Sequence, residues 1–172
     1  MQDIQYLIGV DGGGTGTRIA IAGLDGVELV RAEGGASALQ QGIEKAWVNI
    51  NETIAKGFDA LGITPDRSRC AVGFGLSGVH NRAWAAEFEN TNPGYGRVIV
   101  ESDGFSTLLG AHNGAHGGII AVGTGSIGEA WLLTAHASKW AAGAFRPQMK
   151  LGRYLGLKPS TTCNACLTAA SR

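Results

Sequence analysis

The sequence predicts an α/β fold in which a mixed sheet is flanked by helices. Three observations support this prediction. Short apolar runs with strand character recur along the chain, a long segment with helical spacing follows the first three runs, and later runs alternate with further helical patterns. Such alternation of strands and helices is typical of α/β domains.

The elements are expected in the following order. Strands are predicted near residues 5–10, 18–24, 28–33, 70–76 and 97–101. A helix is predicted over residues 42–61, because apolar residues recur there at the spacing that forms one helix face. The residues of this face are Trp47, Ile50, Ile54, Phe58 and Leu61. We expect the face to pack on the sheet, and further helices to follow the strands near residues 76 and 101.

The first glycine-rich turn, Asp11-Gly12-Gly13-Gly14-Thr15-Gly16-Thr17, is expected to be a hairpin, since strand character resumes at Arg18. Glycine permits positive φ and lets backbone N–H groups approach an anion, and the Thr15 and Thr17 hydroxyls add donors. Asp11 is suited to hold Mg²⁺ through water. No Gly-Lys-Ser/Thr follows, which excludes a Walker-type loop. The alternative is a tight hairpin that binds no ligand.

A second glycine-rich turn, Gly123-Thr124-Gly125-Ser126, follows the apolar run 118–122. With Gly128 it matches the G-x-G-x-x-G pattern of dinucleotide-binding folds. That interpretation requires an acidic residue about 20 positions further on, and no Asp or Glu follows Glu129. A second phosphate-binding loop explains the same residues and also explains the first turn.

Asp103 ends the run 97–102 and precedes a helical pattern. Groups at such strand ends face ligands in α/β sheets. A carboxylate beside two phosphate loops can accept the proton of a substrate hydroxyl that attacks the γ-phosphate of ATP. The alternative is an aspartate that only caps the following helix. Position alone does not separate these two interpretations.

Together with three further segments, these motifs resemble the BadF/BadG/BcrA/BcrD ATPase family, and within it the N-acetylglucosamine and glucosamine kinases of the actin-like superfamily. The matching segments occur in the family's order and are 9–17, 35–37, 75–78, 102–104 and 123–128. The resemblance implies a ribonuclease-H-like (actin-like ATPase) domain over residues 1–115. It also implies that residues 116–132 form the first strand and phosphate turn of a second such domain.

The resemblance implies a role for each motif. The Gly12–Thr17 and Gly123–Ser126 turns would hold ATP, with Mg²⁺ at Asp11, and Asp103 would be the catalytic base. Ser37, Ser77 and Gly78 would contact the amino sugar together with Asp103, although serine and glycine equally serve turns and caps. The function implied is ATP-dependent phosphorylation of N-acetylglucosamine or glucosamine.

Composition is that of a globular, cytoplasmic enzyme domain, with 44% hydrophobic and 16% charged residues. No apolar run is long enough to span a bilayer, and the N-terminus lacks the pattern of a signal peptide. We expect a small-molecule amino sugar as partner and neither nucleic acid nor membrane. A homodimer is the candidate assembly of the full-length protein.

Residues 133–172 are expected to be an aberrant tail. Residues 1–129 carry 8 Lys/Arg and 14 Asp/Glu, whereas residues 130–172 carry 6 Lys/Arg and no acidic residue. We interpret the tail as translated largely out of frame. Regrouping suitable codons by one base yields Asp-Gly-Ser-Arg, Val-Gly-Gly-Trp-Gly-Phe and Asp-Glu-Ala, which resemble kinase segments in the family's order. Because the family kinases are much longer, this chain alone is expected to lack turnover.

Two other functions stay open. Cys163-Asn164-Ala165-Cys166 is a C-x-x-C pair, which beside a phosphate-binding core also fits the ATPase activators of 2-hydroxyacyl-CoA dehydratases and their iron–sulfur cluster. Two thiolates are fewer than the four ligands of such a cluster or of structural zinc. Cys70 is expected to be a buried small apolar residue. The third candidate is a remnant that binds sugar or nucleotide without catalysis.

Overall fold

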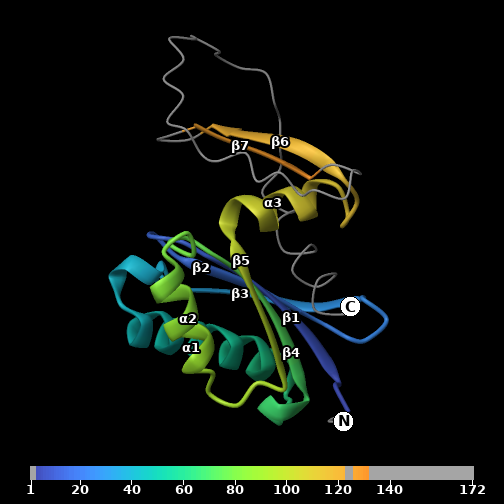
Figure 1. Cartoon of the computed structure of the whole chain (residues 1–172). Helices are drawn as coiled ribbons and strands as arrows, with labels where there is room; N and C mark the ends of the chain where they lie inside the picture. Colours follow the sequence, from blue (N-terminus) through green and yellow to red (C-terminus); the bar gives the residue numbers. More distant parts are fainter. Residues whose placement is uncertain (1–2, 123–125, 132–172) are drawn as a thin grey trace.

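The computed structural model describes residues 3–122 and 126–131 and confirms the α/β class (Figure 1). Five strands form a mixed sheet in the order β3-β2-β1-β4-β5. β1 (Tyr6–Gly12), β2 (Thr17–Ala22) and β3 (Glu28–Gly34) form an antiparallel meander. β4 (Cys70–Leu76) and β5 (Arg97–Ser102) follow β1 on its other side in parallel. Each strand end lies within two residues of its predicted place.

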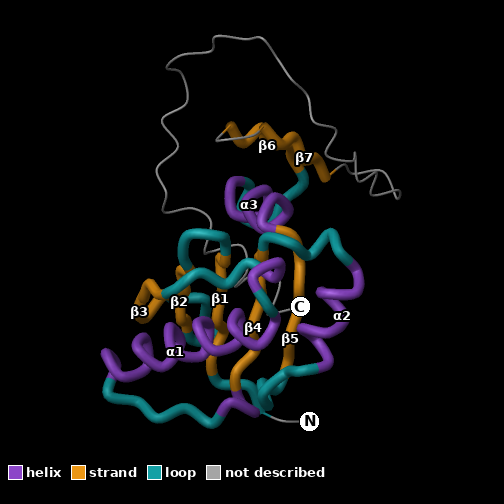
Figure 2. Tube along the Cα trace, turned by 90° about the vertical axis from the view of Figure 1, so that its left-hand side faces the viewer, coloured by secondary structure: helices purple, strands orange, loops and turns teal. Residues whose placement is uncertain are grey.

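The helices α1 (Ile43–Leu61) and α2 (Arg82–Asn90) cover one face of this sheet (Figure 2). Two short 3-10 helices, η1 (Leu39–Gln41) and η2 (Arg67–Arg69), precede α1 and β4. The predicted helix over 42–61 is confirmed, and it ends at Gly62, which has a left-handed φ of 68°. In the part of the chain that the structure describes, no helix combines the length and apolar character needed to cross a membrane.

The covered face is filled by large apolar side chains. Trp47 stacks on Phe88 with ring centroids 4.0 Å apart and meets the edge of Phe74 at 5.4 Å. The Trp47 Nε1–H donates to the Phe88 carbonyl at 3.2 Å and to the Thr91 hydroxyl at 3.0 Å, so the indole is satisfied although it is buried. Phe58 of α1 is fully buried. The predicted apolar stripe of α1 therefore forms the main core, as expected.

The opposite face of the sheet carries small residues. Ala20, Ala22 and Ala71 are buried there with Leu7, and glycine lies beside them at positions such as Gly73. Among the described helices, α3 (Asp103–Ala111) contacts this side at β1 and β4. A Cβ on Gly75 would collide with the hydroxyl of Ser106, so the missing side chain lets α3 approach the sheet closely.

A separate two-stranded sheet follows α3. β6 (Gly117–Val122) pairs antiparallel with β7 (Ser126–Trp131), and the Trp131 ring lies 6.0 Å from Phe105 of α3. The segment after residues 123–125 is thus a strand, whereas a dinucleotide-binding turn precedes a helix. The dinucleotide interpretation is therefore wrong. The boundary expected near residue 116 stays a prediction, and the tail 132–172 with its C-x-x-C pair lies outside the described residues.

Candidate functional site

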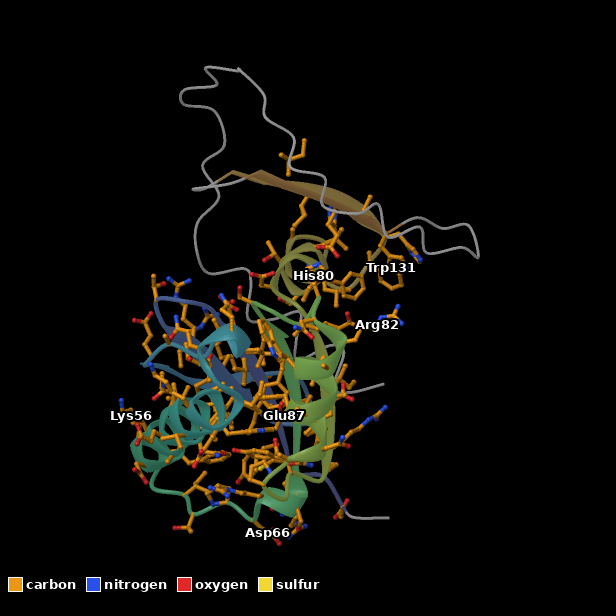
Figure 3. The ribbon with its side chains drawn as sticks, turned by 60° about the vertical axis from the view of Figure 1, so that its left-hand side comes forward. Lys56, Asp66, His80, Arg82, Glu87 and Trp131 are labelled. Carbon is orange, nitrogen blue, oxygen red and sulfur yellow. The ribbon has the colours of Figure 1, made fainter. Side chains whose placement is uncertain are left out.

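The predicted site residues of the first turn, the segments after β3 and β4, and the start of α3 gather at one edge of the five-stranded sheet. Strand pairing aligns one residue of every strand in a single row, namely Gly34, Thr17, Gly12, Leu76 and Ser102. The connections that follow β1, β3, β4 and β5 leave the sheet from this row. Figure 3 shows His80 and Arg82 at this end of the domain, near α3, and Asp66 at the opposite end. The fold thus brings together the first turn, Ser37, Ser77–Gly78 and Asp103.

The first turn is a hairpin between β1 and β2, as predicted. Gly13 N–H closes it by donating to the Gly16 carbonyl at 3.0 Å. None of the glycines from Gly12 to Gly16 has a φ in the left-handed region, so the turn does not use the positive φ that glycine permits. Glycine is needed for space instead. A Cβ on Gly12 would collide with the Ser37 hydroxyl and with Leu76, whereas a Cβ on Gly13 would meet nothing within 4 Å.

The carbonyl groups of Gly12, Gly13 and Gly14 in this turn all accept hydrogen bonds from other protein groups. The Gly12 carbonyl accepts from Ser77 N–H at 2.9 Å, and the Gly13 carbonyl accepts from Ser37 and Ala38 N–H at 3.1 and 3.2 Å. The Gly14 carbonyl accepts from the Gln41 side-chain amide at 3.0 Å. By contrast, the N–H groups of Gly14, Thr15 and Gly16 have no hydrogen-bond acceptor among the described residues. Successive N–H groups that a turn leaves without a protein acceptor can bind an anion.

Thr15 and Thr17 differ in where their hydroxyls lie. Thr15 is exposed at the tip of the turn. Thr17 is 1% exposed, and its hydroxyl lies 2.5 Å from the Gly35 carbonyl and 2.7 Å from the Ser37 hydroxyl. Ser37 is also 1% exposed. Both side chains are buried, and their hydroxyl groups connect the turn to the segment that follows β3.

The Ser77–Gly78 loop lies against the same segment. Ser77 donates its N–H to Gly12, and its carbonyl accepts from Leu39 N–H at 3.0 Å. Gly78 has a φ of 98°, and a Cβ there would come within 2.8 Å of the Gln40 side-chain oxygen. A larger residue at position 78 would therefore be strained and crowded. Both predicted residues are half-buried beside the first turn.

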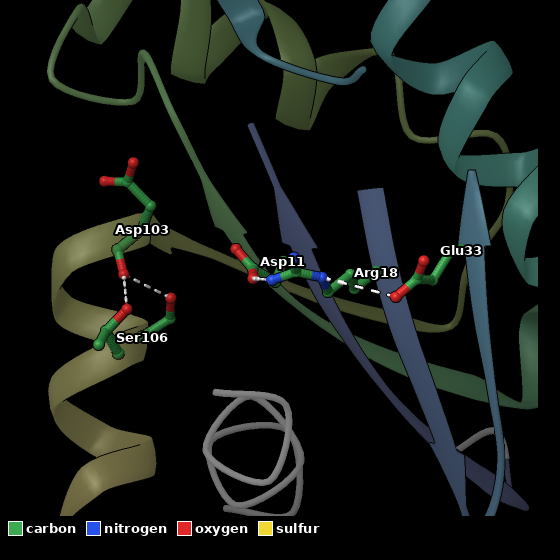
Figure 4. Close-up of polar contacts among 6 residues, drawn as sticks. Asp11, Arg18, Glu33, Asp103 and Ser106 are labelled. Atoms are coloured by element: carbon green, nitrogen blue, oxygen red, sulfur yellow. Dashed lines mark hydrogen bonds and ion pairs between the residues drawn. The ribbon is translucent and has the colours of Figure 1, made fainter. Parts of the chain in front are cut away.

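Asp103 is the first residue of α3, and Ser102 is the cap. The Ser102 hydroxyl accepts from Phe105 N–H at 3.1 Å, so the interpretation of Asp103 as a mere helix cap is wrong. The Asp103 carboxylate is half-buried and accepts from Gly104 N–H at 2.8 Å. The Asp103 carbonyl accepts from the hydroxyls of Ser106 and Thr107 (Figure 4). These contacts fix the start of α3 while the carboxylate stays accessible.

Asp11 lies in the next row of the sheet, beside Arg18 and then Glu33 (Figure 4). Arg18 Nη1 is 3.8 Å from Asp11 Oδ2, and Arg18 Nε is 3.7 Å from Glu33 Oε1. Burial raises the pKa of Asp11 above its usual value; the Arg18 charge opposes this, and the Asp103 charge adds to it.

Sequence analysis missed two residues of this arrangement, Arg18 and Gln41. A charged residue that directly precedes the apolar run 19–22 is a signal for Arg18. No pattern in the neighbouring sequence indicates a role for Gln41, because its hydrogen-bond partner Gly14 is 27 residues away in sequence.

The second predicted phosphate turn cannot be placed in the same way. Gly123, Thr124 and Gly125 lie outside the described residues, and Ser126 begins β7. Within residues 3–122 and 126–131, no three His, Cys, Asp or Glu side chains form a cluster suited to a metal ion. A site built mainly from protein ligands is therefore absent from this part. Mg²⁺ commonly uses one or two carboxylates with substrate phosphates, and the predicted single ligand Asp11 is compatible with that pattern.

No family model matches the chain, but the chain is similar to known proteins, among them the following two. A glucosamine kinase of Vibrio cholerae is 32% identical over 127 residues, which are 73% of this chain and 43% of that protein. A crystal structure of a proposed N-acetylglucosamine kinase from Chromobacterium violaceum is similar with a TM-score of 0.72 and 56% identity. The predicted resemblance to the amino-sugar kinases is confirmed.

The ribonuclease-H-like fold expected from that resemblance is confirmed as well, because the match includes 76% of this chain. The chain spans 43% and 46% of the two proteins, less than half of each. Neither comparison favours the alternative of a dehydratase activator. Cys70 is fully buried and burial raises its pKa to about 11, as expected for a small core residue without a ligand role.

Proposed function

We propose that this chain supplies the phosphate-binding turn and the catalytic base of an ATP-dependent amino-sugar kinase. The observation that carries the proposal is the hydrogen-bonding pattern of the first turn. Its carbonyls at Gly12, Gly13 and Gly14 are bonded to protein donors, and the N–H groups of Gly14, Thr15 and Gly16 have no acceptor among the described residues. The names of both similar proteins, a glucosamine kinase and a proposed N-acetylglucosamine kinase, support the substrate class.

In this proposal the turn binds ATP phosphates through backbone N–H groups and the exposed Thr15 hydroxyl. Thr17 and Ser37 hold the turn from the interior through their buried hydroxyl pair. Ser77 and Gly78 face the amino sugar, beside Asp103. The turn formed by Gly123, Thr124, Gly125 and Ser126 contacts phosphate from the second domain. Mg²⁺ bound with ATP would be held on the side of Asp11 and would neutralise phosphate charge.

Asp103 acts as the base. Its carboxylate accepts the proton of a sugar hydroxyl as that oxygen attacks the γ-phosphorus, the bond to the β–γ bridging oxygen breaks, and ADP leaves. A base must be close to the reacting hydroxyl and held still. The bonds of the Asp103 carboxylate to Gly104 and of its carbonyl to Ser106 and Thr107 provide that fixed position.

Turnover belongs to a protein of the relatives' full length, because the chain spans less than half of each. Phosphoryl transfer relies on positioning and charge stabilisation in a site that excludes water, and the described residues form one side of such a site. A cytoplasmic location and a homodimeric assembly of the full-length protein are part of the same proposal.

Asp103→Asn in the full-length protein tests the base. We expect ADP release with glucosamine or N-acetylglucosamine to fall by at least about 100-fold, the usual contribution of a general base, while MgATP affinity stays within twofold. Ser102→Ala serves as the matched control, since it removes the helix cap and leaves the carboxylate in place. Turnover retained in Asp103→Asn would contradict the assignment.

A further inference from the structure

Gln41 lies in η1 and is exposed, yet its side chain reaches back to the tip of the first turn. Its Nε2 donates to the Gly14 carbonyl at 3.0 Å. We propose that Gln41 is a positioning residue which turns the Gly14–Thr15 peptide so that the Thr15 N–H faces a bound phosphate. This inference rests on the proposed phosphate-binding role of the turn.

The geometry of the peptide unit gives the reason. In a planar trans peptide, the carbonyl of one residue and the N–H of the next point in opposite directions. No cis peptide occurs in the described residues. Gln41 draws the Gly14 carbonyl to its own side, so the Thr15 N–H points to the other side. If that peptide flipped, a carbonyl oxygen would face the phosphate, and the interaction would become repulsive.

The preceding peptide is fixed in a different way. The Gly13 carbonyl is held by the backbone N–H groups of Ser37 and Ala38, which orients the Gly14 N–H without any side chain. The turn therefore contains two neighbouring N–H groups, one oriented by backbone and one by the Gln41 side chain. Removal of the Gln41 amide should release the Thr15 N–H and leave the Gly14 N–H in place.

Gln41 can serve as an anchor because the backbone around it is fixed. Leu39 is buried and donates its N–H to the Ser77 carbonyl. Gly42 has a φ of 114° and donates its N–H back to Leu39, which ends η1 directly before α1. The side chain of Gln41 thus starts from a rigid point. Its neighbour Gln40 lies in the same 3-10 helix but is directed to Gly78.

The test uses the full 172-residue chain labelled with ¹⁵N and titrated with MgATP, with amide shifts and affinity as readouts. In the wild type we expect both the Gly14 and the Thr15 amide signals to shift. In Gln41→Ala and Gln41→Glu the Thr15 shift should be lost and the Gly14 shift retained. Affinity should fall between about threefold and tenfold, the contribution of one neutral hydrogen bond. Gln40→Ala is the matched control and should leave the Thr15 shift unchanged.

The outcomes separate the inference from the proposed function. Absence of both shifts in the wild type would overturn the phosphate-binding role of the turn, and the inference with it. Wild-type shifts that persist at Thr15 in both Gln41 variants would overturn the inference alone. Equal loss at Gly14 and Thr15, or the same loss in Gln40→Ala, would also overturn it, because either result indicates general loosening. Thermal midpoints of all variants, recorded alongside, report whether the fold is kept.

Discussion

The two faces of the five-stranded sheet differ in what they contribute. The face under α1 and α2 is filled by large rings such as Phe58, Phe74 and Trp47. The other face carries alanine and glycine, and near its edge it carries charge, with Asp11 and Arg18 side by side. Large apolar burial supplies most of the folding free energy, whereas small residues permit close approach of other groups. The residues that supply most of the stability and the charged residues of the candidate site thus lie on different sides of one sheet.

The largest expected effect concerns the helix-covered face. Phe58→Ala should lower the free energy of unfolding by about 3–5 kcal/mol, because a fully buried ring is replaced by a cavity. Urea denaturation measures this loss. Leu24→Ala is the control, since Leu24 is 61% exposed and its truncation should change stability by less than about 0.5 kcal/mol. Equal losses in the two variants would contradict the claim that the buried ring of Phe58 supplies this share of the folding free energy.

A smaller effect is expected where α3 approaches the other face. Gly75→Ala places a methyl group against the Ser106 hydroxyl and should cost about 1–3 kcal/mol through overpacking. Ser106→Gly in the same chain removes the obstructing side chain. The double variant should therefore lose less than the sum of the single variants, as a double-mutant cycle in urea will measure. Strict additivity would show that the close approach of α3 does not depend on Gly75.

The smallest effect concerns charge at the edge. Because burial raises the pKa of Asp11 above the unfolded value of 3.8, its ionisation weakens the fold as pH rises from that value through the folded pKa. Asp11→Asn should therefore have a higher thermal midpoint than the wild type at pH 7. The difference between the two midpoints should shrink at a pH below 3.8, where Asp11 is protonated and therefore as neutral as the asparagine. A lower midpoint at pH 7 would mean that the Arg18 pair outweighs burial.

Local sequence patterns were sufficient to predict the fold. The alternation of apolar runs placed all five strands of the main sheet, and the stripe from Trp47 to Phe58 placed α1. These signals repeat over short distances and need no partner elsewhere in the chain. The nearness of the first turn and Asp103 was expected from their positions at strand ends, and the place of Ser77 beside them was expected only from the family resemblance. The cause of this clustering is the register of β1, β4 and β5.

The sequence was less informative about individual side chains. Thr15 and Thr17 have the same chemistry and both suited a phosphate, yet Thr17 points inward to Ser37. Which of the two is buried depends on the pairing of Thr17 with Gly34, a contact across strands that no local pattern encodes. The role of Gln41 was hidden for the same reason. The glycines permit a positive φ at the turn, but the structure does not use it, and of Gly12 and Gly13 only Gly12 is needed for space.

The central claim is that the first turn binds phosphate, and a titration of MgATP into the wild-type chain and Gly13→Val tests it most directly. A Cβ on Gly13 meets nothing within 4 Å, so this variant should keep the wild-type thermal midpoint. Its side chain would occupy the space proposed for phosphate. We predict that calorimetry will detect binding to the wild type and an affinity at least about tenfold lower for the variant, a difference of about 1.4 kcal/mol. Equal affinity in the two proteins would contradict the account.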